Sequence, residues 1–137
     1  MWILFAFGSA LFAGLTAILA KCGIRNTDSN VATALRTGVV LVFSWLMVFM
    51  VGAQSGIRDI SAKVLIFLIL SGLSTGISWL CYYRALQTGP ASVVVPIDKL
   101  SILVTIAFSY IVFHEKLSLK SGTGLLLIVV GTLALLI

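Results

Sequence analysis

The stretch KVLIFLILSGLSTGISWLCYYRAL, residues 63–86, decides the fold class of this sequence. No charged residue lies between Lys63 and Arg84, and most of the intervening side chains are apolar. A helix needs about 20 apolar residues to cross a hydrocarbon core about 30 Å thick. The stretch is therefore predicted to be a transmembrane α-helix.

Four further stretches reach this length within the usual tolerance. They lie near residues 2–20, 32–53, 91–113 and 120–137, and the connections between them are short. Strands are excluded because an open sheet edge cannot satisfy its backbone groups in lipid, and no alternating barrel pattern appears. The first stretch lacks a basic leader, so we expect it to be a retained helix. The sequence predicts an all-α, polytopic membrane protein with five transmembrane helices in a single domain, residues 1–137.

The composition supports lipid as the solvent of this chain. Of 137 residues, 61% are hydrophobic and 9% are charged, against about 25% charged residues in soluble domains. The net charge of +5 comes from basic residues that flank the helices, where anionic headgroups lie. These features predict a multi-pass protein of the cell (inner) membrane.

Several function classes are disfavoured. No basic run with interleaved aromatic residues supports nucleic-acid binding. Cys22 and Cys81 are too few and too far apart for a metal site or a disulfide framework. His114-Glu115 begins like a zinc-protease motif, but Ser118 occupies the position of the second histidine. We expect no enzyme activity, no metal and no cofactor.

The charges at the helix ends do not fix the orientation. Loop Lys and Arg number four on the N-terminal side and two on the other, which alone favours a cytoplasmic N-terminus. Arg36 and Arg84 lie in helices near the second side and raise its count to 2 + 2 = 4. With balanced flanks the chain is a candidate for insertion in both orientations.

Ionisable residues within the predicted helices are the first candidates for a substrate or ion pathway. Each costs at least about 2.5–3.5 kcal/mol at the bilayer centre and needs a partner or a purpose. They are Arg36, Arg84, Asp98 and Lys99, all toward one membrane face. Asp98 lies about 10 Å deep at 1.5 Å per residue, and Lys99 is expected to point about 100° away from it.

Polar stripes on two helices extend this pathway. Asp98, Ser101, Thr105 and Ser109 share one face of the fourth helix, and Ser71, Thr75, Ser78 and Tyr82 share one face of the third. They predict a polar interior, although such hydroxyls also bond back to their own helix or to neighbouring helices. Pro96 removes the hydrogen bond to the Ser92 carbonyl and is predicted to interrupt the helix just before Asp98. This indicates either a transporter-like broken helix or an ordinary kink.

Small and aromatic residues complete the candidates. Gly72 and Gly76 form a GxxxG spacing whose face continues to Trp79 and Tyr83, and Gly14 ends a small-residue ridge on the first helix. Helix packing is the favoured role of the glycines. The aromatic residues Trp79, Tyr82 and Tyr83 either form an interfacial belt or line a cavity.

The order of several short motifs resembles the EamA-domain family of the drug/metabolite transporter superfamily. The motifs are Tyr83-Arg84-Ala85-Leu86, Gly89-Pro90-Ala91, Pro96, Glu115-Lys116-Leu117, and Gly122 and Gly131 on the last helix. The resemblance covers essentially the whole chain. Asn30-Val31 stands where relatives often open the second helix with a proline, and His114 stands where many have a small residue.

The resemblance implies half of a ten-helix inverted-repeat transporter. Family members usually contain two five-helix repeats of opposite orientation around a central cavity, and this sequence contains one repeat. Two antiparallel copies would rebuild that arrangement, so a homodimer is expected, with a homologous partner subunit as second choice. The expected function is secondary transport of a small metabolite or drug-like solute by alternating access. The alternatives are a non-transporting membrane subunit and a small channel.

Overall fold

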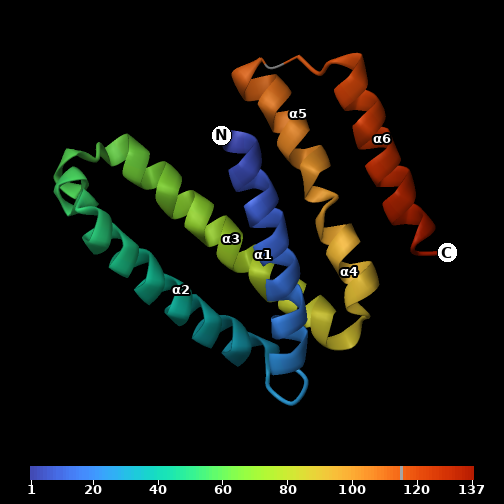
Figure 1. Cartoon of the computed structure of the whole chain (residues 1–137), viewed down its shortest axis with the longest axis horizontal. Coiled ribbons are helices and arrows are strands. Elements are labelled where there is room, and N and C mark those ends of the chain that lie inside the picture. The colour runs from blue at the N-terminus through green and yellow to red at the C-terminus, as the bar shows by residue number, and fades with distance from the viewer. Residues whose placement is uncertain (115) are drawn as a thin grey trace. The chain divides into compact units, whose positions relative to one another are not determined.

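The computed structural model describes residues 1–114 and 116–137, and every regular element among them is helical (Figure 1). The elements are α1 (Trp2–Gly23), α2 (Ser29–Val51), the 3₁₀ helix η1 (Ala53–Asp59), α3 (Ala62–Thr88), α4 (Ala91–Asp98), α5 (Ser101–Phe113) and α6 (Leu119–Ala134). The prediction of an all-α protein is confirmed.

Four segments are long and apolar enough to cross a membrane. They are α1, α2, α3 and the stretch Ala91–Phe113 that contains α4 and α5. The fifth, α6, is a shorter apolar helix of 16 residues, about 24 Å long at 1.5 Å per residue. Large apolar side chains such as Phe67 and Leu73 are exposed along the helices, as expected where lipid is the solvent. The chain is thus a multi-pass membrane protein of five helical segments.

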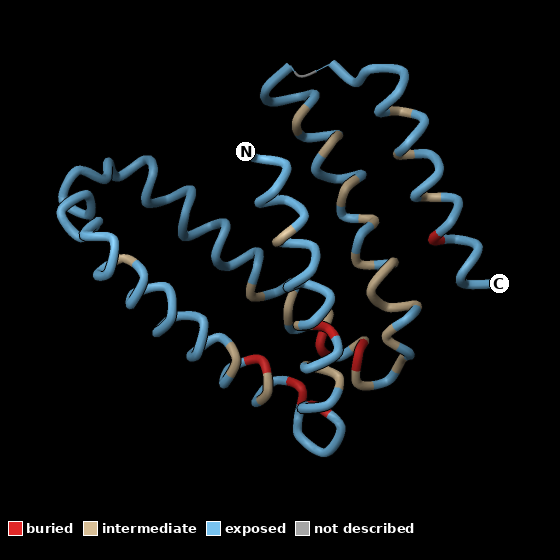
Figure 2. The backbone as a smooth tube through the Cα atoms, in the orientation of Figure 1, coloured by how far each residue is buried: buried red, intermediate tan, exposed pale blue. Residues whose placement is uncertain are grey.

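The N-terminal unit, Met1–Gln87, contains α1, α2 and α3 and buries few of its residues. Its buried residues gather where α1 ends, α2 begins and α3 ends (Figure 2). Ile24 and Leu86 are 1% and 0% exposed, and Ala17 and Ser29 are also buried. The three helices of this unit therefore share a small core at one end, and their remaining lengths offer apolar surface.

Hydrogen bonds attach the first loop to α3 beside this core. The side-chain amide of Gln87 donates to the backbone carbonyls of Thr27 at 2.9 Å and Ile24 at 3.3 Å. The ammonium group of Lys21 donates to the carbonyl of Leu86. These bonds supply donors to two carbonyl groups of the first loop and to one in the last turn of α3.

A side-chain cap starts α2. The Asp28 carboxylate accepts hydrogen bonds from the backbone N–H groups of Asn30 at 2.8 Å and Val31 at 3.4 Å. Aspartate is among the preferred capping residues because its oxygen satisfies the otherwise unpaired first N–H groups. The cap marks the beginning of this helix. Gly52 ends α2 with φ 73°, a left-handed conformation that favours glycine.

The C-terminal unit, Thr88–Ile137, contains a helix interruption that differs from the prediction. α4 continues through Pro96 to Asp98, and the break lies at Lys99 and Leu100. There the ladder tightens to three-residue bonds, from Lys99 N to Pro96 O at 3.1 Å and from Leu100 N to Ile97 O at 2.9 Å. The prediction that the helix is interrupted before Asp98 was therefore wrong. The helix continues past the proline, and the interruption follows as a 3₁₀-like turn.

The described residues His114 and Ser118 end α5 and begin α6. His114 ends α5 with φ 53°, a left-handed conformation that histidine adopts more readily than most residues. Ser118 begins α6, and its hydroxyl accepts from the backbone N–H of Ser121 at 3.1 Å. Glu115, part of the Glu115-Lys116-Leu117 motif, lies outside the described residues.

Candidate functional site

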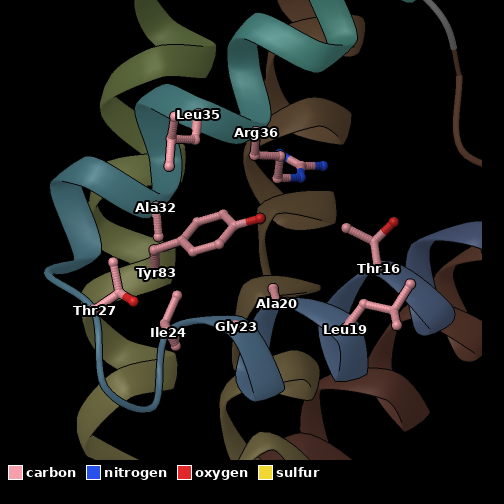
Figure 3. Close-up of a pocket in the computed structure, with 10 residues that line it drawn as sticks. All are labelled: Thr16, Leu19, Ala20, Gly23, Ile24, Thr27, Ala32, Leu35, Arg36 and Tyr83. Carbon is pink, nitrogen blue, oxygen red and sulfur yellow. The ribbon is translucent and has the colours of Figure 1, made fainter.

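A cavity of about 430 Å³ lies within the N-terminal unit, between the end of α1, the first loop, α2 and α3 (Figure 3). Its walls are mostly apolar, with a few polar side chains. The lining residues are Thr16, Leu19, Ala20, Gly23, Ile24, Thr27, Ala32, Leu35, Arg36 and Tyr83. This volume is within the range of about 300–1,000 Å³ found for small-molecule sites.

One charged side chain, Arg36 of α2, lies against two aromatic rings of α3. Its guanidinium carbon is 4.2 Å from the centre of the Trp79 ring and 5.6 Å from the centre of the Tyr83 ring. Trp79 and Tyr83 are four residues apart, so they share one face of the helix. Attraction between a cation and an aromatic face contributes about 0.5–2 kcal/mol and helps to hold this charge within an apolar unit.

Two polar atoms of this cluster are buried without a hydrogen-bond partner among the described residues. They are Nη1 of Arg36 and the hydroxyl oxygen of Tyr83, a residue that is 2% exposed. In Figure 3 both groups point to the same side of the cavity, where Thr16 and Leu19 of α1 are drawn. An unpaired buried polar group costs about 1–3 kcal/mol. A charged N–H donor and a hydroxyl beside the cavity therefore lack a hydrogen-bond partner among the described residues.

The other predicted residues of α3 lie around this cluster. The Tyr82 ring meets the Tyr83 ring edge to face, with 6.1 Å between the ring centres and an interplanar angle of 84°. Ser78 and Arg84 are exposed and do not line the cavity. Of the residues predicted on this helix, the structure thus brings Trp79 and Tyr83 together with Arg36.

The predicted residues of α4 and α5 belong to the C-terminal unit. Lys99 Nζ lies 3.6 Å from Asp98 Oδ2, and the two side chains are 58% and 37% exposed. The expectation that these neighbours do not face the same point was wrong, because α4 ends at Asp98 and the long lysine side chain bends back. The Thr105 hydroxyl donates to the Ser101 carbonyl at 3.2 Å, which matches the alternative of bonding within the helix.

The glycines predicted to mediate packing leave open space within their own units. A Cβ atom built on Gly14, Gly72, Gly76 or Gly131 meets nothing within 4 Å. Their predicted role in close helix contacts stays a prediction. Among residues 1–114 and 116–137, no three His, Cys, Asp or Glu side chains are grouped to hold a metal ion.

Sequence reasoning missed the α1 side of the cavity and the loop attachment. Thr16 and Leu19 resemble any other residues of an apolar helix, and only the packing of α1 identifies them as cavity residues. Gln87 carried a usable signal, since an amide next to a helix end often bonds to loop carbonyls.

Comparison with known proteins gives a family and several relatives. Residues 1–137 match the EamA family, described as the EamA-like transporter family. The "Uncharacterized transporter in cobO 3'region" of Sinorhizobium sp. is 42% identical over 134 residues, which cover 98% of this chain and 95% of the relative. The "Uncharacterized transporter YvbV" of Bacillus subtilis is 33% identical over 128 residues, which cover 93% of this chain but 42% of the relative.

A third relative carries a more specific name. The "Probable 4-amino-4-deoxy-L-arabinose-phosphoundecaprenol flippase subunit ArnE" of an Enterobacter strain is 40% identical over 70 residues. That match covers 50% of this chain and 64% of the relative. No solved structure shows significant similarity to the chain.

Proposed function

Since this chain belongs to the EamA-like transporter family, and so to a family of transporters rather than enzymes, we propose that it is a secondary transporter that works by alternating access. Its cargo is a small metabolite or drug-like solute. The observation that carries this proposal is the cavity where Arg36 lies on Trp79 and Tyr83 with unpaired polar atoms. A half-buried charge beside a cavity in an apolar helical unit is typical of a ligand site in a membrane protein.

A second five-helix unit completes the proposed transporter. Inverted-repeat transporters place their site between two oppositely oriented units. The match to YvbV covers 42% of that longer protein, which supports the interpretation of this chain as one half of such an architecture. We assign the second half to another copy of the chain inserted antiparallel, consistent with the balanced basic residues.

The second candidate is a subunit that functions only with a different, homologous partner. It is favoured by the relative whose name describes a flippase subunit. In both cases residues 1–137 act as one transmembrane domain.

The roles of the remaining candidates follow from their chemistry. Asp98 binds a proton or a cationic group during the transport cycle, and Lys99 competes for the same carboxylate. Pro96 and the turn after it provide a flexible point in the path. We also propose that Ser78, Tyr82 and Arg84 of the N-terminal unit and, separately, Ser101 and Thr105 of the C-terminal unit offer polar groups to the solute.

Thiol labelling tests the assembly. Cys22 is exposed near the end of α1, and Cys81 is replaced by serine so that one thiol remains. Intact cells receive a membrane-impermeant thiol reagent, and a second label follows permeabilisation. About half of the Cys22 should react from each side if the chain inserts both ways. Reaction from one side only rules out a homodimer of inverted repeats and redirects the search to a partner protein.

Reconstitution tests transport itself. Proteoliposomes are loaded with a panel of radiolabelled carboxylates, amino acids and amines, and counterflow is measured. Saturable counterflow that Arg36→Gln removes supports a carrier with its site in this cavity. The matched control is Arg58→Gln, which alters an exposed arginine of η1. Ohmic current in place of counterflow would identify a channel, and inactivity restored by a partner would identify a subunit.

A further inference from the structure

We propose that the cavity of the N-terminal unit binds an amphipathic anion, with its oxyanion head on Arg36 and Tyr83 and its apolar body along α1. The inference rests on the proposed function, because it names the class of solute that the same site takes. It is carried by the geometry of two side chains and by the lining of the cavity.

Arg36 holds its guanidinium group beside the cavity. Its Cζ lies over the Trp79 ring, 4.2 Å from the ring centre. A guanidinium group carries its N–H donors in its own plane. Nη1 is buried and has no partner among the described residues. A planar donor fork of this kind suits carboxylate and phosphate oxygens.

Tyr83 adds a second donor on the same side. Its hydroxyl is buried and unpaired among the described residues, while its ring lies 5.6 Å from the guanidinium carbon. An oxyanion accepts hydrogen bonds from both groups at once. A cationic ligand would be repelled by Arg36, and an apolar ligand would leave both donors unsatisfied at about 1–3 kcal/mol each.

The charge of the cavity is unbalanced. Among the described residues Arg36 makes no ion pair, and none of the residues that line the cavity is acidic. A positive charge with no counter-charge in the lining favours an anionic occupant over a neutral one of the same shape. The cavity itself thus selects for negative charge.

The rest of the lining selects for an apolar body. Leu19, Ile24 and Leu35 contribute hydrocarbon surface, and the volume of about 430 Å³ is much larger than a bare inorganic anion requires. Burial of apolar area contributes roughly 25 cal/mol per Å², so a ligand that covers these walls gains affinity. The same chemistry occurs in a free carboxylate with a ring or alkyl chain and in the headgroup of an anionic lipid.

Trp79 provides a direct readout of binding. In the double variant Trp2→Phe, Trp45→Phe it is the remaining tryptophan, and neither replaced residue lines the cavity. Purified protein in maltoside micelles is titrated with benzoate and with dioctanoylphosphatidylglycerol. Benzamide and dioctanoylglycerol serve as neutral counterparts of each. We expect a saturable change of Trp79 emission with one or both anions and none with the neutral molecules.

Three further variants assign the response to the two side chains. Arg36→Gln should abolish it, Tyr83→Phe should weaken binding about 10-fold through the loss of one charge-assisted hydrogen bond, and Arg58→Gln should leave it unchanged. Arg36→Lys keeps the charge but not the fork and should bind more weakly than the parent. Circular dichroism and gel filtration establish that each variant is folded.

The outcomes separate the sources and the hypotheses. A response to benzoate alone assigns a free solute, a response to the lipid alone assigns a headgroup, and a response to both assigns the shared oxyanion. Equal binding of the neutral molecules, no response to either anion, or unchanged binding in folded Arg36→Gln overturns the inference. Anion binding without counterflow in proteoliposomes overturns the transporter proposal instead. Counterflow of neutral solutes without anion binding overturns the inference alone.

Discussion

The guanidinium carbon of Arg36 lies 4.2 Å from the centre of the Trp79 ring, a contact that joins α2 to α3 within the N-terminal unit. An unaccompanied charge at membrane depth costs at least about 2.5–3.5 kcal/mol. The attraction between the cation and the aromatic face offsets about 0.5–2 kcal/mol of this cost. The same contact therefore stabilises the unit and keeps a charged donor beside the cavity.

Replacement of Trp79 by leucine should destabilise the protein more than replacement of Trp45. Trp45 contacts Phe49, with 6.1 Å between ring centres, and it is a matched control without a cation. We expect Trp79→Leu to lower the free energy of unfolding by about 1–2 kcal/mol more than Trp45→Leu, since it also loses the cation–π attraction. Titration with dodecyl sulfate in mixed micelles, followed by circular dichroism, measures both values. Equal losses would show that Arg36 gains nothing from the ring.

The Gln87 amide is expected to hold the first loop against α3. In Gln87→Glu two carbonyl oxygens, of Thr27 and Ile24, would face a carboxylate instead of an N–H donor. The cost should be about 1–3 kcal/mol of unfolding free energy, because the carbonyls lose their donor and meet negative charge. Gln54→Glu, on the exposed η1 helix, is the control and should change stability little. A similar small effect at both positions would mean that water replaces the Gln87 bonds.

The length of the apolar stretches made the fold predictable. The composition of residues 63–86 alone predicted a membrane helix, and α3 extends over Ala62–Thr88. The sequence predicted that the helix around Pro96 is interrupted, but it did not predict the residue at which the interruption lies. Proline removes a known hydrogen bond, but which later bonds tighten depends on how the backbone relaxes at Lys99 and Leu100.

The sequence predicted the residues of the candidate site on α2 and α3 but not those on α1. A charge in an apolar helix singles out Arg36, and two aromatic residues four apart single out Trp79 and Tyr83. Their contact is a tertiary property that no single helix encodes. Thr16 joins the cavity only through the packing of α1, and Lys99 reaches Asp98 through rotatable bonds that helix geometry does not constrain.

The start of α2 should depend on the Asp28 cap. Asp28→Ala removes the acceptor of the Asn30 and Val31 N–H groups and should cost about 1 kcal/mol of unfolding free energy. Asp28→Asn should retain most of the stability, because an amide oxygen caps about as well. Asp59→Ala, in the exposed η1 helix, controls for the loss of a charge. The unfolding titration is the measurement, and an Asp28→Ala protein as stable as Asp59→Ala would show that the cap contributes nothing.

The proposed role of Asp98 leads to a prediction about coupling. The carboxylate lies 3.6 Å from the Lys99 ammonium group. Both residues lie at the break between α4 and α5, where three-residue backbone hydrogen bonds appear. If Asp98 exchanges Lys99 for a proton or cationic group during transport, Asp98→Asn should retain ligand binding in the N-terminal cavity but lose the dependence of counterflow on pH. Lys99→Gln is the control, since it frees the same carboxylate without removing it, and it should keep the pH dependence. Counterflow by Asp98→Asn with the parent's pH dependence would remove Asp98 from the coupling mechanism, because no titrating group would then remain at this position.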